Sequence, residues 1–132
     1  MAINYSVSQR ANPKDSMAEP KWYANAQAKN RLTMDALCRL VEKATTLSSG
    51  EVRAVLTDAI SFITEALEAG DTVEFGDLGS FGIALSSTGA TTEEDFDASY
   101  IKKARVTFFP GRAFQQMCKR LQYEKVSVRP HV

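Results

Sequence analysis

The residues best suited to hold a ligand are cations near the C-terminal end: Lys102, Lys103, Arg105 and Arg112. Ammonium and guanidinium groups bind phosphate oxygens, and Arg does so through two parallel hydrogen bonds. If residues 101–109 form a strand, Lys103 and Arg105 share one face, because successive side chains alternate. This spacing favours phosphate contacts on one side of a sheet, with Lys119 and Arg120 as outlying candidates. A solvated sheet face is the alternative.

Charge is distributed unevenly along a chain whose formal net charge is zero. Residues 1–50 carry seven Lys or Arg and four Asp or Glu, while residues 51–99 carry Arg53 against eleven acids. Residues 100–132 carry eight basic residues against Glu124 alone. A basic C-terminal segment favours a polyanion as partner. The alternative is that the two halves neutralise each other within the molecule.

Catalytic and metal chemistry have little support. Cys38 and Cys118 have no metal or redox spacing, so we expect structural roles as reduced thiols. The one histidine, His131, lies near the C-terminus. No glycine-rich phosphate loop is present, and calcium-loop spacing is absent from the acidic residues Glu93, Glu94, Asp95 and Asp97. We expect no enzyme activity, cofactor, metal or small-molecule substrate.

The N-terminal residues lack the apolar core of a signal peptide, and no apolar run approaches the roughly 18 residues that span a bilayer. We therefore expect a cytoplasmic protein with no membrane partner. The length of 132 residues suits one domain with an extension.

The N-terminal region alternates apolar and polar residues from Ile3 to Gln9, which is typical of a strand. A polar loop containing Pro13 and Pro20 comes next, and Lys21 to Ala26 offer a second strand. We predict a β-hairpin with a long tip.

Two helices are predicted next. Thr33 is a suitable cap for the first, and Ser48 with Glu51 forms a capping-box pair at the start of the second. Gly70 suits a left-handed end. The second helix carries apolar residues at helical spacing: Val52, Val55, Leu56, Ala59, Ile60, Ile63 and Leu67.

After Gly70 the pattern predicts three strands, over 72–75, 80–85 and 101–109, and a short helix over 112–121. So small a sheet is a modest cover for the apolar stripe of the second helix. We therefore predict a homodimer with two-fold symmetry, whose interface is formed by the second helix through Val55, Leu56, Ile60, Ile63 and Leu67.

Three stretches carry a resemblance to a known family. Leu32-Thr33 opens the first helix, residues 73–81 read VEFGDLGSF, and residues 106–112 read VTFFPGR. In this order and at these separations they resemble the HU / integration host factor family of bacterial histone-like DNA-binding proteins, from about Leu32 to Leu121. The added N-terminal segment resembles that of Bacteroides-type HU-like variants.

The resemblance implies an α+β fold: a two-helix hairpin, a three-stranded antiparallel sheet with a β-arm, and a short C-terminal helix, in an intertwined homodimer. An N-terminal β-hairpin would be added to it. The implied ranges are 1–31 for the extension, 32–122 for the HU-like domain and 123–132 for a tail. The implied partner is the backbone and minor groove of double-stranded DNA, bent by arms whose tips wedge between bases.

The arm of this chain departs from the family. Residues 86–99 contain four acids, no Lys or Arg and no Arg-Asn-Pro tip. Phosphate would repel these carboxylates, so we expect that this arm does not enter a minor groove. Phe109 stands where the family usually has Lys or Arg. Phe96 and Tyr100 are expected to anchor the base of the arm, with a wedge or stacking role as the alternative.

The N-terminal loop offers a candidate replacement tip in Arg10, Pro13 and Lys14, around the sequence Arg-Ala-Asn-Pro-Lys-Asp. An ordinary turn is the alternative. Trp22 and Tyr23 are expected to cover a sheet or dimer seam, with base stacking as the alternative.

Together these features predict non-sequence-specific DNA binding by a homodimer acting as an architectural, nucleoid-associated protein. DNA contacts are expected at Lys102, Lys103, Arg105, Arg112 and Lys119. The alternative is an HU-like fold used as a protein-interaction or assembly module, because a fold does not dictate function.

Overall fold

The computed structural model describes residues 1–11, 13–15 and 17–127. Contacts divide the chain into two compact units, which are described separately: Met1–Thr33 with Lys119–Val132, and Met34–Cys118. The α+β composition matches the predicted fold class. Within the described residues no helix is both long and apolar enough to cross a bilayer.

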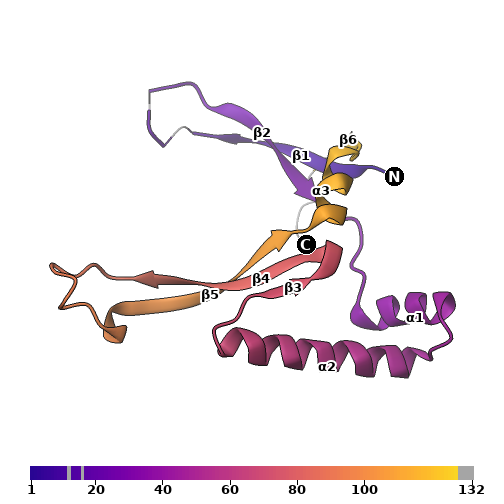
Figure 1. The fold of residues 1–132 in the computed structure, drawn as a ribbon. Helices are drawn as coiled ribbons and strands as arrows, with labels where there is room; N and C mark the ends of the chain where they lie inside the picture. Colours follow the sequence, from indigo (N-terminus) through magenta and orange to yellow (C-terminus); the bar gives the residue numbers. More distant parts are fainter. Residues whose placement is uncertain (12, 16, 128–132) are drawn as a thin grey trace. The chain divides into compact units, whose positions relative to one another are not determined.

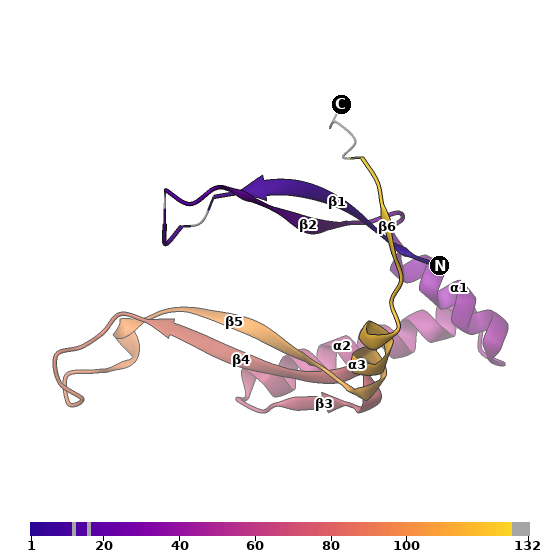
Figure 2. The same ribbon diagram turned by 90° about the horizontal axis from the view of Figure 1, so that it is seen from above.

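The first unit is a three-stranded sheet in the order β2-β1-β6. The predicted hairpin is confirmed: β1 (Ile3–Arg10) pairs antiparallel with β2 (Lys21–Gln27) in a long ribbon (Figure 2). The third strand was not predicted. Residues 123–125, expected to lie in a tail, form β6 (Tyr123–Lys125) and pair parallel to β1 from Ile3 to Tyr5. Three residues are too few to display a period in the sequence.

One face of this ribbon is closed by hydrogen bonds between side chains of β1 and β2. Gln27 Nε2 donates to Ser6 Oγ at 2.8 Å, and Asn25 Nδ2 donates to Ser8 Oγ at 2.7 Å. Ser6 is 1% exposed. These bonds satisfy polar groups that would otherwise be costly to bury.

The second unit begins with two helices, α1 (Met34–Ala44) and α2 (Ser49–Glu68), which pack against each other. Ser48 caps α2: its Oγ accepts from the N–H of Glu51 at 3.2 Å and donates to Glu51 Oε1 at 3.0 Å. Gly70 ends it as predicted, with φ 93° and the adjacent Asp71 N–H donating to the Ala66 carbonyl.

The remainder of this unit is the sheet β3-β4-β5, antiparallel as predicted, followed by α3 (Arg112–Lys119). β3 (Val73–Phe75) is short, whereas β4 (Gly79–Ser87) and β5 (Ile101–Pro110) form a ribbon that projects beyond the helices (Figure 1). A 3-10 turn, η1 (Gly76–Leu78), joins β3 to β4. The predicted order of elements in this unit is confirmed.

The two glycine-containing motifs of the sequence, residues 73–81 and 106–112, contact each other where β5 leads into α3. The Gly111 N–H donates to the Leu78 carbonyl at 2.9 Å. A Cβ on Gly111 would lie 2.3 Å from the Asp77 carbonyl oxygen, and one on Gly79 (φ 146°) would lie 2.3 Å from the Phe109 carbonyl oxygen. Both positions therefore exclude a side chain. Beside this junction Phe108 contacts Phe81, with ring centroids 5.1 Å apart, and Phe114, at 6.1 Å.

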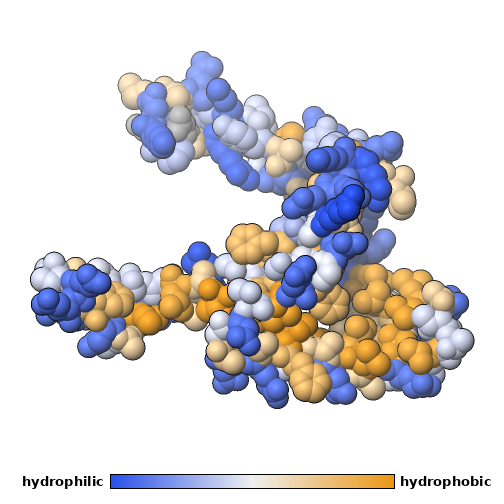
Figure 3. Space-filling view, in the orientation of Figure 1, coloured by the Kyte–Doolittle hydropathy of each residue, from blue (hydrophilic) through white to orange (hydrophobic). Residues whose placement is uncertain are grey.

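Few apolar side chains are buried in this single chain. Among the described residues, only Cys38 and Val52 are buried apolar side chains, and both belong to the helix pair. Apolar side chains instead gather on the surface over α1, α2 and the adjoining sheet, whereas the far end of the β4–β5 ribbon is polar (Figure 3). No residue of α3 is buried either, although Ala113, Phe114 and Met117 carry its apolar side.

Candidate nucleic-acid interface

The pairing of β4 with β5 sorts their side chains onto two faces. Ala84 pairs with Arg105 and Ser86 with Lys103, so the two cations share one face as predicted. We call this the basic face; its residues on β5 are Lys103, Arg105, Thr107 and Phe109, and those on β4 are Ser80, Gly82, Ala84 and Ser86. At its β3 edge it also carries one acid, Glu74, the partner of Ser80. The opposite, apolar face carries Phe81, Ile83, Leu85, Ala104, Val106 and Phe108.

The basic face is open because the β4 residues on it are small. The two cations face a serine and an alanine, and Thr107 faces Gly82, where an added Cβ would lie 3.5 Å from Thr107 Oγ1. No side-chain hydrogen bond crosses between β4 and β5 on this face in the described part of the chain. The side chains of Lys103 and Arg105 can therefore extend into solvent beyond their small neighbours on β4.

The cations of the C-terminal region are exposed. Arg53 of α2 forms an ion pair with Asp35 of α1. Within the described ranges no cation of residues 100–127 pairs with an acid of residues 51–99. In the part of the chain that the structure describes, no ion pair therefore supports the alternative in which the two halves neutralise each other.

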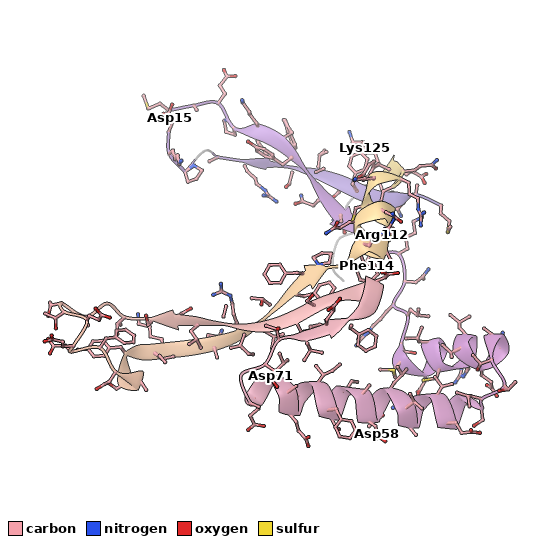
Figure 4. The ribbon with its side chains drawn as sticks, viewed as in Figure 1. Asp15, Asp58, Asp71, Arg112, Phe114 and Lys125 are labelled. Atoms are coloured by element: carbon pink, nitrogen blue, oxygen red, sulfur yellow. The ribbon has the colours of Figure 1, made fainter. Side chains whose placement is uncertain are left out.

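The other predicted phosphate contacts lie outside the set of paired residues that forms the basic face. Lys102 falls at the irregularity in pairing between Ser86 and Ser87, where the alternation of faces is interrupted. Arg112 and Lys119 are the first and last residues of α3 and are exposed; Figure 4 shows Arg112 beside the junction with the ribbon. The prediction that Lys103 and Arg105 share one face is confirmed. Lys102, Arg112 and Lys119 remain predicted phosphate contacts outside that face.

The candidate N-terminal tip lies at the end of the β1–β2 ribbon. Arg10 ends β1 and is held there: its Nη2 donates to Asn25 Oδ1 at 2.7 Å, and its guanidinium lies 5.8 Å from the ring centroid of Tyr23. Lys21 is its partner across the ribbon. Pro13 and Lys14 are exposed in the connection, whereas Asn12 is outside the described residues.

The predicted interface residues of α2 differ in exposure. Val55 and Ile60 are 59% and 53% exposed, whereas Leu56, Ile63 and Leu67 are only partly exposed. Phe62, which the sequence stripe missed, is the most exposed large apolar residue of α2, at 68%. At about 100° per residue, Phe62 lies beside Val55 on one flank of the stripe and Ile60 lies on the other. The signal in the sequence that could have identified Phe62 is a large apolar residue that stands outside the helical spacing of the stripe.

The acidic connection of the arm, residues 88–100, is ordered by local contacts. The Thr88 N–H donates to the Tyr100 carbonyl at 2.9 Å, and Phe96 stacks on Tyr100 with centroids 5.2 Å apart. The two aromatic residues thus pack on each other. The Ser99 hydroxyl and N–H donate to Asp97, the latter at 2.9 Å, and these bonds hold the pKa of Asp97 below its ordinary value.

Trp22, Cys38 and Cys118 are the remaining residues that the sequence singled out. Trp22 is 65% exposed on β2, and both cysteines are free, Cys38 buried and Cys118 exposed. Over the ranges that the structure describes, no three His, Cys, Asp or Glu side chains gather where a metal ion could be held.

Comparisons with known proteins agree with this geometry. The family model described as an HU domain fused to a wHTH, Ig or glycine-rich motif matches residues 1–125. A putative DNA-binding protein from Bacteroides vulgatus ATCC 8482 superposes with a TM-score of 0.66 at 14% identity. The match covers 98% of this chain and 50% of that one, so this chain spans about half its length.

The HU of Anabaena, solved in a complex with DNA, superposes with a TM-score of 0.53 at 20% identity, covering 67% of this chain and 98% of that one. Likenesses at these identities establish the fold. The comparison with curated proteins found no match.

Proposed function

The chain belongs to the family of HU domains fused to a wHTH, Ig or glycine-rich motif, and from this premise we propose that it binds double-stranded DNA without sequence preference, as an architectural, nucleoid-associated homodimer. The observation that carries the proposal is the basic face. Lys103 and Arg105 lie exposed on one side of the sheet, over small residues and without an ion pair in the described ranges.

Phosphate is the ligand that this arrangement suits. Two side chains separated by one residue on a strand lie about 7 Å apart and project the same way, so they can contact a backbone together. Contacts to phosphate position a protein on DNA without reading bases. We therefore expect binding to vary little between sequences.

The expected affinity is modest. Two to four phosphate contacts per protomer, with no basic arm, place the dissociation constant near the non-specific range of about 10⁻⁴ to 10⁻⁶ M at physiological salt. Each contact also adds about 0.9 to the steepness of the salt dependence on logarithmic axes.

The test is the double variant Lys103→Ala/Arg105→Ala, measured by fluorescence anisotropy on several duplexes over a range of salt. It should weaken binding to every duplex similarly and flatten the salt slope by about 0.9 for each phosphate that is no longer neutralised. The matched control, Arg39→Ala/Lys43→Ala, removes the same charge from α1 and should bind as the parent does. Parent-like binding by the first variant would overturn the assignment of the basic face.

If the double variant of the basic face binds DNA as the parent does, the next candidate DNA contacts are Arg10, Pro13 and Lys14. The triple replacement Arg10→Ala/Pro13→Ala/Lys14→Ala would then lower duplex affinity where Lys103→Ala/Arg105→Ala does not. Their support is the position of Arg10 opposite Lys21 at the end of the β1–β2 ribbon.

The homodimer part of the proposal is supported by the apolar surface of the helix pair. Val55, Ile60 and Phe62, on the two flanks of the α2 stripe, are each more than half exposed in the single chain, and so much exposed apolar surface is typical of an interface. In isolation Ile60→Asp would cost little, because the side chain is already half exposed. In a dimer it buries an unpaired charge, among the costliest single changes.

Analytical ultracentrifugation distinguishes these cases. Ile60→Asp should dissociate or unfold the protein, whereas Ser61→Asp, on the polar side of the same helix, should sediment as the parent does. A folded monomer at micromolar concentration in the parent would rule out the dimer.

A protein-interaction or assembly module is the second candidate, favoured by the acidic connection of the arm. Its carboxylates are exposed and no Lys or Arg accompanies them in residues 86–99. A parent that sediments as a dimer and binds no duplex at low salt would favour this function over the first.

A further inference from the structure

Phe109 is an exposed aromatic residue on the basic face. Its side of β5 also carries Arg105 and Lys103, and Ser80 is its partner on β4. The residue is 65% exposed. Exposing a phenyl ring to water forgoes about 1.5–3 kcal/mol of burial, so a ring kept on the polar side of a sheet requires an explanation.

Packing within the second unit does not supply that explanation. Phe81, Phe108 and Phe114 form the aromatic cluster, and Phe81 and Phe108 lie on the apolar face. In the described part of the chain Phe109 makes no ring contact. The small neighbours on β4 leave space above the ring. Along β5 the nearest charged residue of this face is Arg105, and across β4 Glu74 of β3, the partner of Ser80, contributes one carboxylate to the same face.

A flat aromatic ring in line with cations has the features of a nucleic-acid stacking platform. The ring can accept the face of a base, while the cations hold the backbone on which that base is carried. Paired bases inside an undistorted duplex present only their edges, so a ring on a sheet face finds an open base face on an unpaired strand. Sequence preference is not expected, because every base has a π-face.

We propose that Phe109 stacks on an unpaired base and that the basic face thereby binds single-stranded DNA in preference to duplex. This inference rests on the proposed function, because it uses Lys103 and Arg105 for the backbone. It adds a role for Phe109 that duplex binding does not require.

The experiment compares a single-stranded thymidine oligonucleotide with a duplex of equal length, by anisotropy, for the parent and three variants. Phe109→Ala should weaken single-strand binding about 5- to 150-fold, the effect of losing one stacked base, and leave duplex binding within about twofold. Phe109→Trp should bind the single strand as well as the parent or better. Phe109→Lys should weaken single-strand binding, strengthen duplex binding and steepen the duplex salt slope by about 0.9.

Val106→Ala is the matched control, because Val106 is similarly exposed, at 61%, on the opposite face. It should not change the ratio of the two affinities. Quenching of a 2-aminopurine base in the oligonucleotide by the parent, and its loss in Phe109→Ala, reports stacking directly.

The possible results distinguish a failure of the stacking role of Phe109 from a failure of the proposed duplex binding. A parent that binds duplex but not the oligonucleotide, or a Phe109→Ala variant that loses both equally, overturns the stacking role and leaves duplex binding intact. A parent that binds neither overturns the proposed function. A change in sedimentation of Phe109→Ala would show that the ring is covered by a second copy of the chain, which also overturns the inference.

Discussion

The chain contains two long antiparallel ribbons, β1–β2 and β4–β5, whose polar faces are organised in opposite ways. On β1–β2 the side chains bond to one another, as Asn25 does to Ser8 and Arg10. On β4–β5 the polar face combines small residues with cations that make no ion pair in the described ranges. The comparison teaches that the same strand geometry closes a face when the donors and acceptors of facing side chains bond to one another, and leaves it open when they do not.

Gly111→Ala should have the largest effect, because it breaks the anchorage of one ribbon and not the other. The added Cβ would lie 2.3 Å from the Asp77 carbonyl oxygen, so the backbone must move. We expect a loss of about 2–3 kcal/mol in the free energy of unfolding, as for other overpacked sites.

Gly89→Ala is the control, since nothing lies within 4 Å of a Cβ there. Hydrogen exchange should quicken in β4–β5 of Gly111→Ala and stay unchanged in β1–β2. Parent-like melting of Gly111→Ala would contradict the close approach.

Asn25→Ala is the corresponding change in the other ribbon. It removes the bonds to Ser8 Oγ and from Arg10 Nη2, both 2.7 Å long, and should cost about 1 kcal/mol. Amide exchange in β1–β2 should quicken, while Asn30→Ala, at an exposed position outside the strands, should leave it unchanged. Equal exchange in both variants would mean that the closed face does not stabilise its ribbon.

Deleting Glu93 to Asp97 should leave duplex affinity unchanged or improve it by a few fold, because these carboxylates repel phosphate. Replacing Glu93, Glu94 and Asp95 with Gln, Gln and Asn keeps the length and should act in the same direction. A large drop in affinity after the deletion would establish that the connection contacts DNA.

The smallest effect concerns the pH dependence of the arm connection. Since bonds from Ser99 lower the folded pKa of Asp97, its contribution to stability is present above the ordinary pKa of 3.8 and is lost as the pH falls through the lower folded value. Asp97 is fully exposed, so the effect is local. An NMR titration of the Ser99 amide should have a midpoint below 3.8, and Asp97→Asn should remove it. A midpoint at or above 3.8 would contradict the bond.

Much of the second unit could be predicted from local patterns. The cap at Ser48, the left-handed Gly70, the three strands and the shared face of Lys103 and Arg105 all derive from spacing and residue type, and the structure confirms each. Such features depend on neighbours within a few residues in the chain.

Other features depend on partners distant in sequence. β6 exists because Tyr123 to Lys125 find β1 more than a hundred residues away, and nothing in three residues signals that pairing. The register of β4 on β5 placed Phe109 above Ser80, on the side away from the Phe81–Phe108 pair. Composition and periodicity thus determined the elements and the charges of this protein. Only the tertiary structure decided which face lies open, because the exposure of a side chain depends on the residues that pack across its strand and not on its neighbours along the chain.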